Sequence, residues 1–131
     1  MNGPIGVFDS GVGGLTVARE IMRQLPGENL VYFGDTARVP YGSKSKQTVL
    51  KYSKQIVRFL KNFDVKTIVV ACNTASAYAL DELEKEIDIP VIGVISPTAK
   101  VVRDTCTEED RIGIIATKVT INTNAYEEKI L

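Results

Sequence analysis

The chain has 131 residues, the size of one domain, and 44% of them are hydrophobic, which is enough for one core. Sixteen Lys and Arg balance sixteen Asp and Glu, so no net charge attracts nucleic acid or an anionic membrane surface. No apolar run can span a bilayer, and no secretory signal is visible. We therefore expect a cytoplasmic protein whose two cysteines are reduced.

The chain contains no histidine. This excludes a Ser-His-Asp triad, a Cys-His dyad and every zinc site that uses histidine, and two cysteines cannot form a four-cysteine zinc site. We expect no metal site. Any chemistry must use Cys, Asp, Glu, Lys, Tyr or backbone groups.

Short apolar runs rich in β-branched residues alternate with segments of helical spacing. In chain order, the expected elements are a strand at 5–8, a helix at 15–25, a strand at 30–33, a helix at 45–62, a strand at 67–71, a helix opening near 73 and ending at 87, a strand at 91–95, a helix at 98–105, a strand at 112–116 and a helix at 122–131. The alternation predicts an α/β fold, with a parallel sheet of about five strands and helices on both faces, as a single domain over residues 1–131.

Small polar residues follow every expected strand. Open α/β sheets bind their ligands at this carboxyl edge, so the concentration predicts a polar ligand held by many hydrogen bonds. In chain order these residues are Asp9 and Ser10, then Asp35, Tyr41 and Gly42, then Cys72, Asn73 and Thr74, then Ser96 and Thr98, and finally Thr117 and Thr120.

Cys72 follows an apolar strand and opens a helix. The positive end of the helix dipole and the unpaired N–H groups there favour a thiolate. The alternative is a small buried core residue. Cys106 lies in a helix end or loop, and we interpret it as structural.

The glycine-rich stretch 9–14 resembles a dinucleotide fingerprint, but Thr16 stands where the third glycine belongs. Its glycines allow a tight turn and bring N–H groups close to a ligand. The alternative is that Asp9 or Ser10 only caps the following helix. Asp35 and Tyr41 form either a second polar cluster or simple turns.

Three motifs, at 5–15, at 32–36 with 40–42, and at 70–76, strongly resemble the glutamate racemases of the cofactor-independent aspartate/glutamate racemase family, and the stretch 114–120 fits as well. The resemblance covers essentially the whole chain and implies the N-terminal lobe of a two-lobe enzyme. Such enzymes invert the α-carbon of glutamate between two cysteines and supply D-glutamate for peptidoglycan.

The resemblance implies roles for particular residues. Cys72 would be one catalytic cysteine, and Asp9 would help to prepare its thiol. Thr117 is a weaker candidate for a substrate contact. The side chains expected to hold glutamate are Asp9, Ser10, Tyr41, Gly42, Asn73 and Thr74. No cofactor is implied.

The motif of the second catalytic cysteine is absent, and the final helical stretch lacks an end signal. We therefore expect a lobe that is inactive alone and that self-associates through the apolar face left uncovered. The alternatives are a racemase for aspartate, a non-catalytic module that binds a small anion at 9–14, and, more weakly, a nucleotide-binding module.

Overall fold

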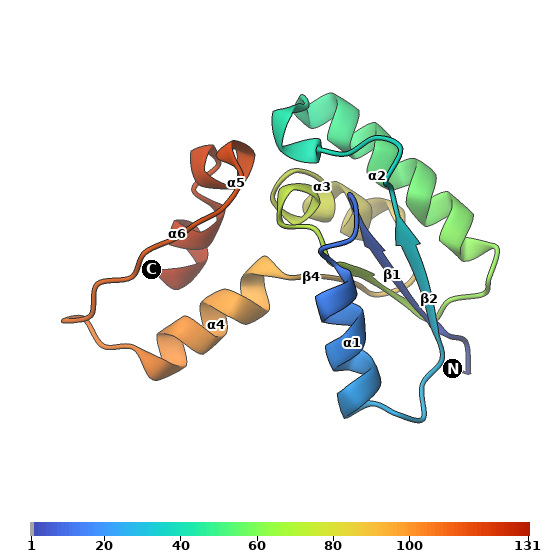
Figure 1. Cartoon of the computed structure of the whole chain (residues 1–131), viewed down its shortest axis with the longest axis horizontal. Coiled ribbons are helices and arrows are strands. Elements are labelled where there is room, and N and C mark those ends of the chain that lie inside the picture. The colour runs from blue at the N-terminus through green and yellow to red at the C-terminus, as the bar shows by residue number, and fades with distance from the viewer. Residues whose placement is uncertain (1) are drawn as a thin grey trace.

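A parallel sheet of four strands forms the centre of the computed structural model, which describes residues 2–131 (Figure 1). The strands are β1 (Ile5–Asp9), β2 (Leu30–Gly34), β3 (Thr67–Val70) and β4 (Val91–Gly93), in the order β2-β1-β3-β4. The register aligns Gly6 of β1 with Val31 of β2 and with Ile68 of β3. The α/β class and the parallel sheet are confirmed, with one strand fewer than expected.

Six α-helices and one short 3-10 helix follow the strands within residues 2–131. They are α1 (Leu15–Gln24), η1 (Tyr41–Ser43), α2 (Lys46–Lys61), α3 (Asn73–Glu86), α4 (Ile95–Thr105), α5 (Lys118–Asn122) and α6 (Ala125–Ile130). Ser45 caps α2 as expected for a serine before a helix, since its hydroxyl accepts the Thr48 N–H at 3.1 Å. None of the helices described is long and apolar enough to cross a membrane.

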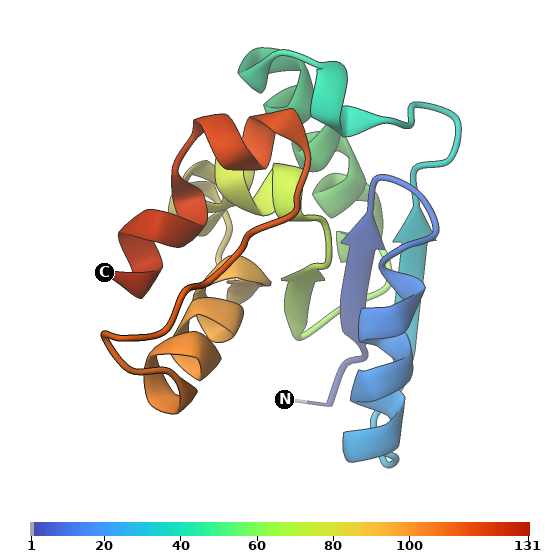
Figure 2. The ribbon, with the colours of Figure 1, turned by 60° about the vertical axis from the view of Figure 1, so that its left-hand side comes forward.

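The two faces of the sheet are covered by different helices, as expected from the sequence (Figure 1, Figure 2). α1 covers one face, where Ile5 and Val7 contact Val17 and Ile21. α2 and α3 cover the other. The buried side chains on that face are Phe8, Ile68 and Val70 from the strands, Val49, Ile56 and Leu60 from α2, and Ala75, Ala79 and Leu83 from α3.

The strand order creates a reversal between β1 and β3. The chain leaves β1 through α1 and moves outward to β2 on one face, and it leaves β3 through α3 and moves outward to β4 on the other. The carboxyl ends of β1 and β3, where the two connections diverge, are the place at which open α/β sheets bind their ligands. Asp9 ends β1, and Cys72 follows the end of β3 at this edge.

The fourth helix begins earlier than expected. Residues 94–95, expected to end a strand, lead directly into α4, so Ser96 and Thr98 lie in its first turn and not in a loop at the sheet edge. Pro97 is tolerated there because the first turn of a helix has no intrahelical partner for its missing N–H. The Thr98 hydroxyl donates to the Val94 carbonyl at 2.7 Å.

The strand expected at 112–116 is not formed within the described part of the chain. A strand needs a neighbouring strand for its backbone groups, and α4 carries the chain away from the sheet before this segment begins (Figure 1). Ile115 is fully exposed there. The helix expected at 122–131 is shorter, since α6 begins at Ala125, and a further short helix, α5, precedes it. Asn124 separates the two helices because it adopts a left-handed conformation (φ 54°).

Ser53 of α2 generates a stability prediction. Its side chain is fully buried, and its hydroxyl is the one buried side-chain oxygen or nitrogen in residues 2–131 without a hydrogen-bond partner. Ser53→Ala removes an unpaired buried hydroxyl and introduces a better helix former, so we expect the free energy of unfolding to rise by roughly 1 kcal/mol. Urea denaturation measures it.

Ser76→Ala is the matched control. The Ser76 hydroxyl is also buried, but it donates to the Val70 carbonyl at 3.2 Å and accepts the Val94 N–H at 3.3 Å. The same substitution should therefore lower the free energy of unfolding at this position, by about 1–2 kcal/mol. Equal effects of the two substitutions would contradict the assignment of Ser53 as unpaired.

Candidate functional site

Cys72 is separated from the end of β3 by Ala71 alone and forms the N-cap of α3. Its Sγ accepts the Ala75 N–H at 3.4 Å, and the residue is only 5% exposed. The thiol is free, as is that of Cys106. The expected position of Cys72, at the junction of strand and helix, is confirmed.

Burial raises the pKa of the Cys72 thiol, because a thiolate would lose its solvation there. The Ala75 N–H and hydrogen bonds from Ser10 lower the pKa, whereas the negative charge of Asp9 raises it further. The balance favours the neutral thiol, which differs from the expectation based on the helix N-terminus alone. The helix end lowers the pKa of Cys72, as expected, but desolvation raises this pKa by more.

Asp9 ends β1 with a buried carboxylate. Its Oδ2 accepts the Gly14 N–H at 2.9 Å and the Gly11 N–H at 3.3 Å, so Asp9 organises the turn into α1. These two N–H groups are therefore not free to bind an anion. This geometry favours the capping interpretation of Asp9 and counts against an anion site built from the glycine backbone.

Close packing explains why glycine occupies position 14. A Cβ on Gly14 would lie 2.6 Å from the Asp9 Cβ and 3.0 Å from the Ala71 Cβ. Tyr32 holds the same turn from β2, since its hydroxyl donates to the Gly11 carbonyl at 3.0 Å. Burial, followed by the charges of Asp9 and Cys72, raises the pKa of Tyr32 to about 12, so this donor stays protonated at neutral pH.

The turn that contains Tyr41 and Gly42 is anchored by a buried carboxylate. Asp35 Oδ2 accepts both the Tyr41 hydroxyl and the Arg38 Nε, the latter at 2.8 Å. Arg38 also stacks 3.9 Å above the ring of Tyr52 on α2. The polar cluster of Asp35 and Tyr41 is thus present. Because the Tyr41 side chain is 1% exposed and its hydroxyl is occupied, a ligand can reach this turn only through its backbone.

Thr74 and Thr117 bring distant parts of the chain together. Their hydroxyl oxygens lie 2.8 Å apart, and Thr117 also caps α5, where it accepts the Thr120 N–H at 3.4 Å. A Cβ on Gly42 would lie 2.9 Å from the Thr117 Cβ, so these residues meet at one place. Three of the candidate residues chosen from the sequence therefore converge.

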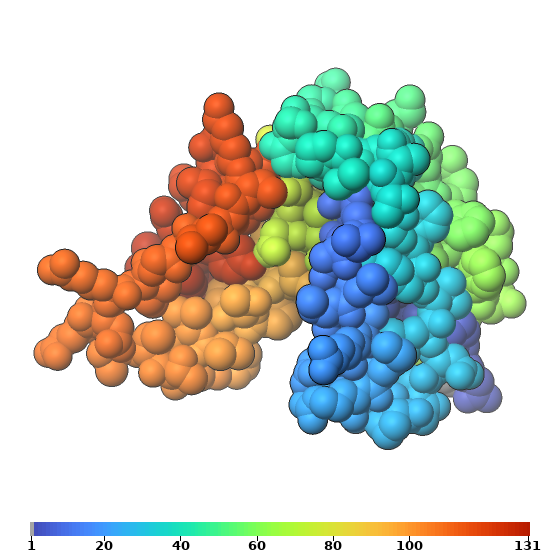
Figure 3. Space-filling model, viewed as in Figure 1, coloured from blue at the N-terminus to red at the C-terminus, as the bar shows by residue number. Residues whose placement is uncertain are grey.

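Asn73, the first residue of α3, is exposed, and its Oδ1 accepts the hydroxyl of Tyr126 on α6. Asn73, Thr74 and Cys72 together place an amide, a hydroxyl and a thiol at one helix end. Figure 3 shows the surface hollowed between α1 and the segment of α4 to α6, with atoms of α3 visible in the hollow. The arrangement suits a small polar ligand beside a thiol that can exchange a proton.

The sequence analysis did not predict three residues that contact the site: Tyr32, Arg38 and Tyr126. Tyr32 occupies an ordinary position in a strand, and Tyr126 is 53 positions away from Asn73, so spacing carries no signal for either contact. Arg38 follows Asp35 by three positions within a turn, a spacing that is a weak signal for a charge pair.

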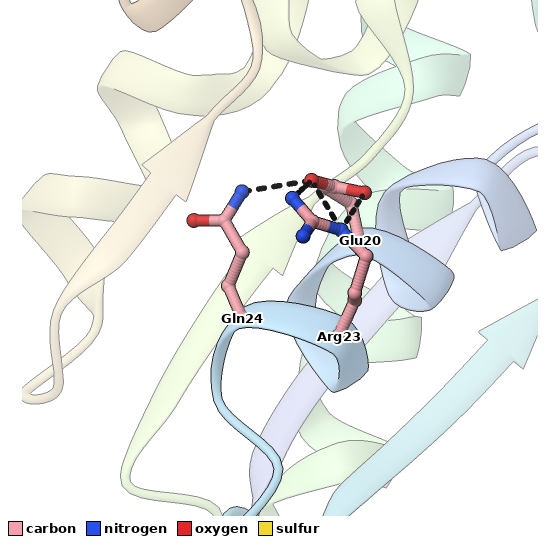
Figure 4. A network of polar contacts seen from close by, with 3 residues as sticks. All are labelled: Glu20, Arg23 and Gln24. Atoms are coloured by element: carbon pink, nitrogen blue, oxygen red, sulfur yellow. Dashed lines mark hydrogen bonds and ion pairs between the residues drawn. The ribbon is translucent and has the colours of Figure 1, made fainter.

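Other polar groups lie away from the candidate site. Glu20 accepts Arg23 Nε at 3.1 Å and Gln24 Nε2 at 2.8 Å near the end of α1 that points away from the carboxyl edge, and the three side chains form an exposed surface network (Figure 4). Cys106 follows α4 and borders the region near the last residues. Among residues 2–131, no cluster of three or more Cys, Asp or Glu side chains could hold a metal ion.

The raised pKa of Cys72 generates a prediction for the pH dependence of stability. A thiol whose pKa is higher in the folded state contributes stability below about pH 8.5, its unfolded pKa, and loses it as the pH rises towards the folded pKa. We therefore expect the free energy of unfolding to fall between about pH 8 and pH 9, where the tyrosines of the unfolded chain, with a pKa of about 10, are still mostly protonated. Urea denaturation at each pH measures the decline.

Cys72→Ala should remove that decline, whereas Cys106→Ser keeps the Cys72 thiol and should retain it. A decline that persists in Cys72→Ala would show that another group causes it.

Comparison with known proteins identifies the family. The model of the Asp/Glu/Hydantoin racemase family matches residues 5–131. Curated glutamate racemases of Geobacter metallireducens and Neisseria meningitidis are 55% and 56% identical over 126 and 128 residues, which is 96% and 97% of this chain. The chain spans about half the length of these relatives, 46% and 47%.

Solved structures agree with the sequence comparison. Glutamate racemase isoform RacE1 of Bacillus anthracis superposes with a TM-score of 0.93 at 50% identity, over 98% of this chain and 48% of its own. The glutamate racemase of Francisella tularensis in complex with D-glutamate superposes with a TM-score of 0.87 at 49% identity, over 98% and 48%. The fold, the identity and the extent of the match lead to one conclusion: this chain belongs to the Asp/Glu/Hydantoin racemase family.

Proposed function

We propose that this chain supplies one half of the active site of a cofactor-independent glutamate racemase, with Cys72 as one of two cysteines that act on opposite faces of the α-carbon. The observation that carries the proposal is the free Cys72 thiol at the N-terminus of α3, at the carboxyl edge of the sheet, beside Ser10, Asn73 and Thr74. The first relatives compared are glutamate racemases, which favours glutamate over aspartate.

The chemistry requires a base on one face of the α-carbon and an acid on the other. One thiolate takes the α-proton, and the opposite thiol donates its own proton to the carbanion, so that the proton count is unchanged and the configuration is inverted. The raised pKa of Cys72 suits the donating role in the free chain. A bound substrate ammonium would act in the other direction and favour the thiolate.

We assign the binding roles from the geometry. Asn73 and Thr74 offer side-chain donors beside Cys72, the backbone of Tyr41 and Gly42 borders Thr74 and Thr117, and Ser10 lies next to the thiol. Asp9 acts through the turn that it organises and through its charge near Cys72. The second cysteine would come from the part of the relatives' length that this chain does not span.

The free cysteines are consistent with a reducing compartment, so we propose that the protein works in the cytoplasm. Its product would be D-glutamate for peptidoglycan, the role implied by the resemblance described from the sequence.

A chimera tests the function. Residues 1–131 would be joined to the remaining half of the Geobacter metallireducens relative, which is 55% identical over the shared part. We expect the chimera to racemise L- and D-glutamate and the 131-residue chain alone to show no turnover, because a single thiol cannot serve both faces. Circular dichroism of the amino acid measures racemisation, and α-proton exchange in D2O measures deprotonation.

Cys72→Ser in the chimera should lower racemisation by about 10²–10⁴-fold, the usual contribution of an acid or base. Cys106→Ser is the matched control and should retain activity. A folded chimera that binds glutamate but racemises it equally well with Ser at position 72 would contradict the catalytic assignment. Faster turnover of aspartate than of glutamate would instead support the alternative substrate.

The uncovered apolar surface gives a second prediction. Ile112, Ile115 and Leu131 are exposed beside α4 to α6, and the missing half of the relatives' length would cover them under this proposal. The 131-residue chain should therefore self-associate as its concentration rises, while Ile112→Thr with Ile115→Thr should weaken the association. Sedimentation velocity distinguishes the outcomes, and a chain that stays monomeric at all concentrations would contradict this expectation.

A further inference from the structure

Tyr126 contacts the candidate site from a distant part of the sequence. It lies on α6 and its hydroxyl donates to Oδ1 of Asn73, the first residue of α3, which adjoins Cys72. Neither the family motifs quoted above nor the proposed mechanism uses Tyr126. The contact joins the segment of α4 to α6 to the catalytic end of α3.

The contact matters because an amide side chain has two chemically different ends. Asn73 can present either its Oδ1 acceptor or its Nδ2 donors to a ligand, and rotation by 180° exchanges them. With Oδ1 held by the Tyr126 hydroxyl, the Nδ2 group is the end that remains to donate. An amide donor attracts a carboxylate, whereas an amide oxygen in the same place would repel it.

We propose that Tyr126 is a positioning residue that fixes the amide orientation of Asn73, so that Asn73 offers its N–H donors to a carboxylate of the ligand bound beside Cys72. The inference rests on the proposed function, which makes this ligand a dicarboxylic amino acid.

The position of Tyr126 is set by the fold and not by a free chain end. Asn124, in its left-handed conformation, turns the chain between α5 and α6. α5 is tied to α3 through the contact of Thr117 with Thr74, and α6 is tied to α4 because the Arg103 guanidinium donates to the Lys129 carbonyl. Both ties hold the Tyr126 ring against Asn73.

Tyr126 is also suited to act as a donor. It is half-buried, and burial raises the pKa of its hydroxyl, while the neighbouring Thr98 acts in the opposite direction. The hydroxyl therefore keeps its proton at neutral pH. A protonated hydroxyl can donate to the amide oxygen, which is the polarity that the structure shows.

The test uses Tyr126→Phe in the chimera, since this substitution removes one oxygen and keeps the ring. We expect KM for glutamate to rise about tenfold, the equivalent of one hydrogen bond to a charged group, with a smaller change in kcat. Tyr78→Phe is the matched control, because Tyr78 is a half-buried tyrosine of the same helix as Asn73 and lies outside the site. It should change KM by less than twofold.

A double-mutant cycle separates positioning from a general structural effect. In an Asn73→Ala background no amide remains to orient, so Tyr126→Phe should have no further effect on KM. An unchanged KM in Tyr126→Phe, or an equal rise with and without Asn73, would overturn the proposal.

Nuclear magnetic resonance of the 131-residue chain tests the contact even if the chimera is inactive. Tyr126→Phe should shift the Asn73 side-chain amide resonances and accelerate their hydrogen exchange, whereas Tyr78→Phe should not. Unshifted resonances would overturn the positioning role by themselves. An inactive chimera with shifted resonances would instead count against the proposed function and leave the positioning contact supported.

Discussion

The parallel pairing of β1 with strands on both sides is the constraint from which the rest of the structure follows. All five residues of β1 are buried, so its backbone groups must be paired by β2 on one side and β3 on the other. Parallel neighbours require crossover connections, and these cross in a right-handed sense. α1 and α3 are therefore sent to opposite faces, and the chain opens between them at the carboxyl edge. The position of the candidate site is a consequence of this topology.

The chemistry of the site depends on how the fold treats a few buried polar groups. Asp9 and Asp35 are both buried carboxylates, and each is satisfied by donors from its own turn. Because Oδ2 of each carboxylate accepts these donors, the two residues shape the turns that follow β1 and β2. Cys72 itself is held at a helix end that favours its thiolate and in an environment that disfavours it. A thiol balanced in this way is one whose protonation a bound charge can change.

Contacts between distant segments of this chain complete its part of the candidate site. Thr117 meets Thr74 and Gly42, and Tyr126 meets Asn73, so the residues after α4 close on the N-terminal end of α3. The same part of the chain carries exposed apolar residues such as Ile115, together with a stretch that has the composition of a strand and no neighbouring strand. Under the proposed function these residues would be covered by the part of the relatives' length that this chain, which spans about half of it, does not include.

Local sequence patterns were sufficient to predict the helices and strands whose own residues carry a clear signal. The stretch 45–62 has an N-cap serine and an apolar stripe, and it forms α2 almost at the expected bounds. The runs that form β1, β2 and β3 are short and apolar, so their composition alone indicated them, although only β1 is buried throughout. The positions of Asp9 and Cys72 followed from these runs, because Asp9 ends β1 and Cys72 comes just after β3.

Tertiary structure decided what depends on partners far away in the sequence. The run 112–116 has the composition of a strand, but composition cannot supply the neighbouring strand that its backbone requires. The protonation of Cys72 follows from burial, which is a property of the whole packed core. The sequence by itself determined the family, the parallel sheet and the residues at the strand ends. The fold decided in favour of the cluster of Asp35 and Tyr41, which the sequence had left open beside simple turns. Only the fold determined that Tyr126 reaches Asn73, because a side-chain contact across 53 residues arises from packing and not from spacing.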